Sequence, residues 1–185
     1  MALPFFFTQS EQGEGLRLIL KNERSEIESR FYDLCKEVVA ASGLSLYDVE
    51  YLDKEQLLRV TIINPATKTA DLDECVRIDR ALTEPIESES WMPEELVLEV
   101  SSPGIYRSLS SLEHFQMVIG EPVKVLLTKR MEGQEYPAQW HGEKRVIAKL
   151  LAANEKNITV SGPDGSSEVS FTYEEMRKAN LETTI

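Results

Sequence analysis

The residues most suggestive of chemistry lie in one short stretch, LEVSSPGIYRSL, at positions 98–109. It brings two adjacent hydroxyl groups, those of Ser101 and Ser102, close to a Pro-Gly pair and to Arg107. Residues of these types at this spacing are compatible with a serine nucleophile, with a phosphate-binding loop, or with a rigid turn between two domains. Other features of the sequence favour the turn.

A serine nucleophile needs a base within hydrogen-bond reach and a third group that orients the base. The sequence contains two histidines, His114 and His141, and both lie in its second half outside any recognisable motif. The stretch also lacks the Gly-x-Ser-x-Gly elbow that exposes a hydrolase serine between a strand and a helix. A serine hydrolase is therefore the least favoured class of function, and we predict that the protein is not an enzyme.

A phosphate-binding loop is also a poor match to the stretch. P-loop and dinucleotide fingerprints place several glycines before a helix, whereas a single glycine here follows a proline. A tight turn fits better, because proline fixes φ at about −65° and glycine permits a left-handed conformation. The sequence therefore predicts a turn formed by Ser101, Ser102, Pro103 and Gly104 at the end of a strand.

Metal-binding and redox chemistry find little support in the sequence. Cys35 and Cys75 each lie within an apolar helical pattern, which predicts two buried, reduced thiols. The histidines are separate from the cysteines and show no spacing typical of zinc ligands. Asp71 and Glu74 are explained by capping of a helix. We therefore predict no metal site and no cofactor.

Hydrophobic periodicity predicts the elements that must position the turn. Residues 25–43 show a helical apolar face of Ile27, Phe31, Leu34, Cys35 and Val38, with a capping box of Ser25 and Glu28 and a stop at Gly43. Residues 46–64 alternate between apolar and polar side chains around a DKEQ turn. This second pattern predicts an antiparallel hairpin.

A second helix is expected to begin at Asp71. Its predicted buried stripe consists of Leu72, Cys75, Val76 and Leu82, and Pro85 should end or kink it. A strand over residues 96–100 follows and leads into the Ser-Ser-Pro-Gly turn. The order helix, strand, strand, helix, strand predicts a two-layer α/β domain over residues 23–108.

Beyond Gly120 the pattern changes to short strands separated by turns. Five strands are expected, at PVKVLL, around AQWHG, and at VIAKLLAA, NITVSG and EVSFT. Short strands at such intervals predict a small β-barrel over residues 109–185. The predicted fold class is therefore α+β with two domains, and residues 1–22 are interpreted as a flexible N-terminal extension.

The net charge of −12 is distributed unevenly. Residues 1–110 contain 11 Lys or Arg and 21 Asp or Glu, a net charge of −10, whereas residues 111–185 contain 9 and 11, a net charge of −2. An acidic half of this kind repels phosphates and attracts a basic protein. Acidity that serves only solubility is the alternative.

The second half also contains cations close to aromatic residues. Trp140 and Tyr136 lie between two pairs of basic residues, and together they have the composition of an RNA-contacting surface. The four cations are Lys129, Arg130, Lys144 and Arg145. Interspersed glutamates dilute the positive charge, and Trp140 is better interpreted as a core residue. Independent RNA binding is therefore a second, less favoured function.

Nothing in the sequence predicts a membrane protein. No run approaches the ~18 apolar residues that cross a bilayer. The first residues also lack the charged n-region of a secretory signal peptide. We therefore expect a cytoplasmic protein with no membrane partner.

Four motifs resemble those of a known family. LEVSSPGIYR closes the first domain, DECVRIDRAL lies in the second helix, GEPVKVLL opens the second domain and KANL lies near the end. Through them, residues 25–181 resemble the bacterial ribosome maturation factor family RimP. Family members commonly carry an acidic residue where this chain has Tyr106 and a proline where it has Ser108.

The resemblance implies a non-enzymatic factor that assists assembly of the 30S ribosomal subunit. It implies binding to the immature 30S subunit and to the basic small-subunit protein S-twelve, with 16S rRNA contact within the subunit. It also implies that the second domain is an Sm-like or SH3-like barrel, and we expect a monomer. Arg107 is retained from the family motif. It either ties the two domains together through a carboxylate, which we favour, or faces the ribosome.

Overall fold

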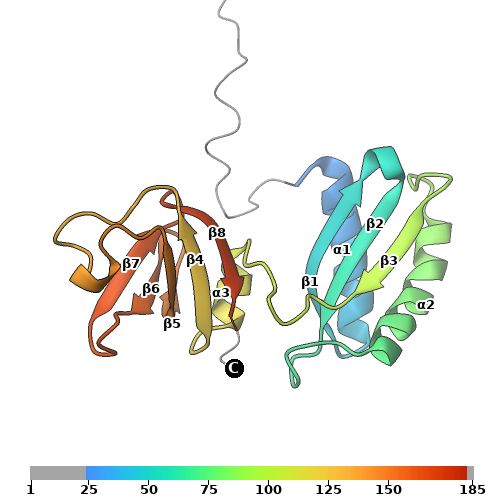
Figure 1. Cartoon of the computed structure of the whole chain (residues 1–185). Helices are drawn as coiled ribbons and strands as arrows, with labels where there is room; N and C mark the ends of the chain where they lie inside the picture. Colours follow the sequence, from blue (N-terminus) through green and yellow to red (C-terminus); the bar gives the residue numbers. More distant parts are fainter. Residues whose placement is uncertain (1–23, 183–185) are drawn as a thin grey trace, which may run out of the picture. The chain divides into compact units, whose positions relative to one another are not determined.

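The computed structural model describes residues 24–182, which divide into two compact units at residues 108 and 109 (Figure 1). The first unit contains α1 (Glu26–Ala41), β1 (Ser45–Leu52), η1 (Asp53–Glu55), β2 (Leu57–Ile63), α2 (Leu72–Ser88) and β3 (Val97–Ser101). The second contains α3 (Leu112–Met117), β4 (Pro122–Leu127), η2 (Ala138–Trp140), β5 (Arg145–Ala153), β6 (Asn157–Ser161), β7 (Glu168–Thr172) and β8 (Met176–Leu181). The α+β class is confirmed. The N-terminal extension predicted for residues 1–22 lies outside the described residues.

The sheet of the first unit has the order β1-β2-β3 (Figure 1). β1 and β2 form the predicted antiparallel hairpin, whereas β2 and β3 are parallel and are connected through α2. Parallel neighbours end at the same edge of a sheet. The loop after β2 and the turn after β3 therefore both start from that edge.

Helix α1 begins and ends where its sequence predicts. Ser25 and Glu28 form a reciprocal capping box, and Gly43 adopts a φ of +75° beyond the last turn. The buried face consists of Phe31, Cys35 and Val39. The prediction placed Val38 on this buried face, whereas the structure places Val39, the next residue, there.

Helix α2 confirms the cap predicted at Asp71 but corrects its buried stripe. Cys75, Ile78 and Leu82 face the core, whereas Leu72 and Val76 are exposed. Val76 lies about 100° around the helix from Cys75, away from the stripe. Pro85 does not end the helix, which continues to Ser88. A proline removes one backbone donor, and this loss is tolerated here within the last turn.

The core of the first unit joins both helices to one face of the sheet. Phe31 is fully buried and lies with its ring centroid 5.0 Å from those of Tyr51 and Trp91. Cys75, Ile78 and Leu82 from α2 belong to the same cluster, as do Leu58 and Val60 of β2. Both helices therefore cover the face to which alternate residues of β1 and β2 point.

The second unit is built on a five-stranded antiparallel sheet with the order β7-β6-β5-β4-β8. Four of the five predicted strands form. The prediction of a strand around AQWHG is wrong, because a single 3-10 turn, η2, follows Pro137 there. The fifth place belongs to β8, which the sequence pattern did not indicate. Among the described residues, no ladder joins β7 to β8, so the pairings show an antiparallel sheet and do not show its closure into a barrel.

Candidate functional site

The Ser-Ser-Pro-Gly stretch continues irregularly from the end of β3, and the turn itself lies at Ile105 and Tyr106, later than predicted. Ser101 is the last residue of β3 and pairs with Thr61 of β2. Gly104 has a φ of +72°, and no atom lies within 4 Å of the position that a Cβ would occupy. Glycine is therefore required here by the left-handed backbone and not by a close approach.

Arg107 fastens this turn to the loop that follows β2. Its side chain is buried, with 6% of the residue exposed, and its Nη1 donates a hydrogen bond to the carbonyl oxygen of Lys68 at 3.0 Å. Its guanidinium carbon lies 5.9 Å from the centroid of the Tyr47 ring. The Nε atom is buried without a hydrogen-bond partner among the described residues. The acceptor identified is thus a carbonyl within the first unit.

Tyr47 also holds the segment around Arg107 in place. Its hydroxyl donates to the carbonyl oxygen of Ser108 at 2.7 Å. Burial raises the pKa of Tyr47, so the hydroxyl keeps its proton at neutral pH and acts as the donor. Arg107 and Tyr47 therefore hold residues 107 and 108 against the first unit.

The histidines that could serve as a base for a serine nucleophile make other contacts. Residues 24–108 contain no histidine. Nδ1 of the buried His114 accepts a hydrogen bond from the backbone N–H of Ser110 at 3.1 Å. Nε2 of His141 lies 2.9 Å from the carbonyl oxygen of Gly133. Both rings have local structural contacts in the second unit.

The two thiols are buried and free, as predicted. Burial raises the pKa of Cys35 to about 12. Burial and the nearby carboxylates of Asp71 and Glu74 raise the pKa of Cys75. Because a thiolate is the reactive form of cysteine, both side chains are structural at neutral pH.

The four cations singled out in the second half of the sequence lie at one end of β4 and β5. Arg145 pairs with Leu126 across the ladder, and the N–H of Leu127 bonds to the carbonyl oxygen of Lys144 at 2.7 Å. The Lys144 Nζ donates to the carbonyl oxygen of Thr128, and Arg130 donates to that of Gly142. Lys144 and Arg130 therefore help to shape the loop between the strands.

All four cations are exposed, but Lys129 and Arg145 differ from the other two in their contacts. Within residues 24–182, no hydrogen bond or ion pair joins either side chain to another group. The fold therefore brings all four cations together, but leaves only these two fully available to a partner.

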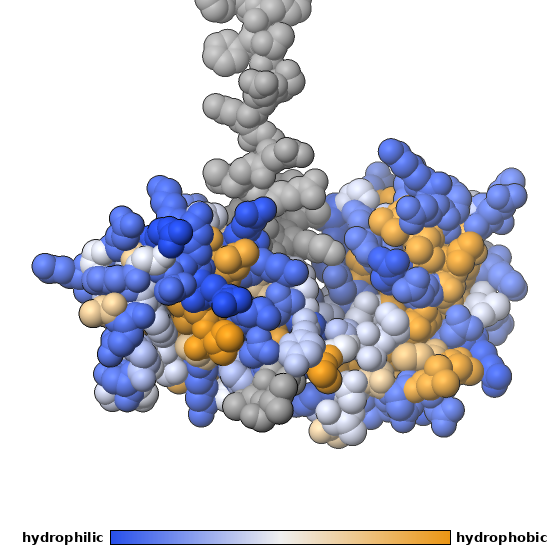
Figure 2. All heavy atoms as spheres, viewed as in Figure 1, coloured by the Kyte–Doolittle hydropathy of each residue, from blue (hydrophilic) through white to orange (hydrophobic). Residues whose placement is uncertain are grey.

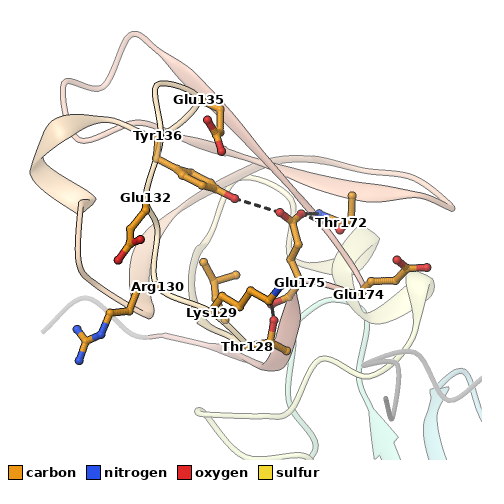
Figure 3. Close-up of a pocket in the computed structure, with 10 residues that line it drawn as sticks. Thr128, Lys129, Arg130, Glu132, Glu135, Tyr136, Thr172, Glu174 and Glu175 are labelled. Atoms are coloured by element: carbon orange, nitrogen blue, oxygen red, sulfur yellow. Dashed lines mark hydrogen bonds between the residues drawn. The ribbon is translucent and has the colours of Figure 1, made fainter. Parts of the chain in front are cut away.

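A pocket of about 590 Å³ opens beside this loop (Figure 3). It is lined by Leu127, Thr128, Lys129, Arg130, Glu132, Glu135, Tyr136, Thr172, Glu174 and Glu175. Carboxylates outnumber cations in this lining, and Figure 3 shows the Arg130 guanidinium pointing away from Glu175. The pocket is therefore not a basic cradle for a phosphate.

Tyr136 and Glu175 form a polar contact in the lining of the pocket. The Tyr136 hydroxyl donates to a Glu175 carboxylate oxygen at 3.0 Å, and the other oxygen accepts from the N–H and hydroxyl of Thr172, both at 2.7 Å (Figure 3). Burial opposes ionisation of Glu175, but the hydrogen bonds from Thr172 and Tyr136 outweigh it and lower the pKa of the carboxyl. Burial and the Glu175 carboxylate raise the pKa of Tyr136 to about 12. The pair is a structural pin, which joins the loop to the turn between β7 and β8.

The aromatic residues near the loop are packed into the second unit. Tyr136 and Trp140 stack on the buried Phe171 with ring centroids 6.1 and 6.3 Å away. Trp140 is therefore a core-packing residue, as expected. Sequence analysis missed the Tyr136–Glu175 contact, because 39 positions separate the two residues and no local pattern connects them.

The first unit thus defines a small α/β domain of two helices on one face of a three-stranded sheet, closed by a turn that a buried arginine holds in place. Residues 34–106 match the model of the RimP N-terminal domain. This match, which includes the Ser101–Gly104 stretch, confirms for these residues the RimP resemblance drawn from the sequence. Residues 34–106 therefore form a domain of the RimP family, a family of ribosome maturation factors. Residues 24–182 contain no helix long and apolar enough to cross a bilayer.

Proposed function

We propose that this protein is a cytoplasmic, monomeric and non-enzymatic assembly factor for the 30S ribosomal subunit. It binds the immature subunit and the basic small-subunit protein S-twelve. The observation that carries the proposal is the match of residues 34–106 to the RimP N-terminal domain. The proposal goes beyond the match to a ribosome maturation family, because it names the 30S subunit and the protein S-twelve as the partners.

The first unit binds the basic protein in this proposal. Its sheet face opposite the helices carries Glu50 and Glu99 on either side of Arg59, with carboxylate-to-nitrogen distances of 2.9 and 3.0 Å. Two carboxylates around one arginine leave a net negative charge on this row. Complementary charge accelerates the encounter with a basic partner.

The second unit orients the complex on the subunit, through an Sm-like or SH3-like barrel. Support for a barrel comes from the strand ladders, because register shifts interrupt both the β4–β8 and the β5–β6 pairing. Bulges of this kind bend strands and increase their twist, as closure of a small sheet requires. The stretch of residues 101–104 with Arg107 leads from the first unit to this second one.

No covalent step is needed for this function. A factor that binds one conformer of the immature subunit more tightly than the others shifts the population towards that conformer. This interpretation agrees with the structural engagement of both histidines and both thiols described above.

Deletion of the gene tests the proposed function. Small subunits that contain precursor 16S rRNA should accumulate, and expression of this chain from a plasmid should restore normal processing. As a control, the same plasmid expresses a variant of this chain that does not bind immature subunits, and this variant should not restore processing. A normal subunit profile in the deletion strain under growth stress would contradict the proposal.

A free-standing RNA-binding module is the second candidate, favoured by the exposed cations Lys129 and Arg145. It predicts strong, salt-dependent affinity for naked RNA. The assembly-factor proposal predicts feeble affinity, because the whole chain carries a charge of −12. Titration of a single-stranded RNA at several salt concentrations separates the two.

A further inference from the structure

Strands β4, β5 and β8 have an exceptional composition within this acidic chain. They contain five cations, Lys124, Arg145, Lys149, Arg177 and Lys178, and no Asp or Glu. By contrast, β1, β2 and β3 contain three carboxylates and one arginine. The three strands lie next to one another in the order β5-β4-β8 (Figure 1).

The register of the ladders places four of these cations on one face. Leu126 of β4 opposes both Arg145 and Lys178, Lys124 opposes Ile147, and Pro122 opposes Lys149. Directly opposed residues point to the same side of a sheet, as do alternate residues along a strand. The intervening residues Val123, Val125, Val146 and Ala179 are buried on the other side. We call the face of Lys124, Arg145, Lys149 and Lys178 the basic sheet face.

Most of the positive charge on the basic sheet face is available. Lys124 pairs with Glu182 at 3.0 Å. Arg145, Lys149 and Lys178 are exposed, and no carboxylate of residues 24–182 lies within ion-pair distance of them. The face therefore offers three unpaired cations, although the chain as a whole is strongly negative.

An apolar centre lies among these cations. Ile147 is 56% exposed and lies between Arg145 and Lys149 along β5. Figure 2 shows hydrophobic spheres bordered by hydrophilic ones on the visible side of the second unit. Aliphatic stems of lysine and arginine extend over apolar surface of this kind and keep their charged groups in water.

We propose that the basic sheet face binds the phosphate backbone of RNA. Alternate residues along a strand are about 7 Å apart and neighbouring strands about 4.8 Å apart. Arg145 and Lys149 are four residues apart on β5, and Lys178 lies two strands away. The three cations are therefore too widely separated to share one phosphate, and they suit successive phosphates of a polyanion.

The mode of binding follows from what the face contains. Its paired rows present no aromatic side chain, and Tyr136 and Trp140 pack on Phe171 instead. Stacking with bases is thus not expected. Contacts to phosphates position a protein without reading the sequence. The RNA is 16S rRNA within the immature subunit, a statement that rests on the proposed function.

The test compares two triple variants of the full chain in binding to purified immature 30S subunits. The first is Arg145→Gln, Lys149→Gln, Lys178→Gln. The matched control, Lys54→Gln, Arg80→Gln, Lys156→Gln, removes the same charge from exposed positions outside the face and outside the loop between β4 and β5. Circular dichroism and thermal unfolding verify that both variants fold.

The face variant should bind at least about tenfold more weakly at 0.1 M salt, and the slope of log affinity against log salt should fall by roughly 2 to 3. The control should change both quantities much less. Equal losses in the two variants, or an unchanged slope in the face variant, would overturn the inference. If the unmodified protein does not bind immature subunits, the proposed function itself fails.

A photoreactive group attached at position 149 identifies the partner directly. Crosslinks to 16S rRNA support the inference. Crosslinks to a ribosomal protein alone would contradict RNA binding and assign the face to an acidic protein surface.

Discussion

The two sheets of this protein present opposite charges on comparable faces. On the first, Glu50 and Glu99 flank Arg59 across three strands. On the second, Arg145 and Lys178 flank Leu126 across three strands, with no carboxylate in any of them. Net charges of −10 and −2 for the two parts of the sequence hide this contrast. The net charge of a sequence segment therefore underestimates the difference in charge between individual sheet faces.

The two units also differ in how they are held together. In the first, capped helices cover one sheet face and Arg107 fastens the last turn to a backbone carbonyl. In the second, the long loop between β4 and β5 is fixed by the Tyr136–Glu175 pin and by stacking on Phe171. Each unit has its own hydrophobic cluster. The following four predictions test these differences.

Core truncation should have the largest effect and should separate the stabilities of the two units. Phe31→Ala and Phe171→Ala each remove a fully buried ring, which costs about 3–5 kcal/mol of unfolding free energy. Trp91 reports on the first unit and Trp140 on the second, so urea unfolding in single-tryptophan backgrounds (Trp140→Phe or Trp91→Phe) follows each. Each truncation should shift only its own transition. Joint shifts would show that the two units unfold as one.

Replacement of Arg107 should destabilise the first unit by about 2 kcal/mol, since a buried hydrogen bond from a charged donor is lost. Arg107→Met preserves much of the side-chain volume. Arg59→Met is the matched control, because its ion pairs are partly exposed and contribute about 0–1 kcal/mol. Urea unfolding monitored at Trp91 measures both. Equal losses of unfolding free energy in the two variants would show that the buried hydrogen bond of Arg107 stabilises the unit no more than the exposed ion pairs of Arg59.

The Tyr136–Glu175 pin should give the second unit a defined pH dependence. Glu175→Gln should cost about 1 kcal/mol near neutral pH, because the partly exposed carboxylate accepts three hydrogen bonds. The folded-state pKa of Glu175 is lowered from 4.5, so its contribution is complete above 4.5 and is lost as pH falls through the folded-state value. The pKa of Tyr136 is raised from 10.0 to about 12, so its contribution is complete below 10.0 and is lost as pH rises through about 12.

Urea unfolding at Trp140 across pH measures this contribution. The difference between the unmodified protein and Glu175→Gln should shrink in acid. Tyr136→Phe should reduce the alkaline loss, and the remainder is expected from the buried Tyr173, whose pKa is also raised to about 12. A difference that stays constant through the acid range would show that the carboxylate's ionisation does not stabilise the unit.

The smallest effect is expected for neutralisation of the acidic row on the first sheet. Glu50→Gln with Glu99→Gln should slow association with the proposed partner, the basic protein S-twelve, about twofold to fivefold at low salt, with little change at high salt. Glu155→Gln with Glu168→Gln removes the same charge from exposed positions in the second unit. Stopped-flow kinetics measure both. Equal slowing would show that total charge matters and the acidic row does not.

Prediction from the sequence worked where the deciding contacts are local. The capping boxes at Ser25 and Asp71 and the alternation of β1 and β2 all follow from residues a few positions apart. It was less accurate for α2, where Leu72 and Val76 are exposed, because periodicity alone does not locate the face that meets the sheet. The strand around AQWHG was wrong because a composition compatible with a strand does not exclude a turn after Pro137.

The sequence by itself determined the elements of the first unit, its family and the acidity of its half, since these depend on local spacing, motif and composition. Only the tertiary structure decided the acceptor for Arg107, which lies 39 positions away on the carbonyl of Lys68. It also decided that Arg145 and Lys178 share a face, through the strand β4 between them. The physical reason is that strand order and register bring distant residues together, and no periodicity along the chain records that pairing.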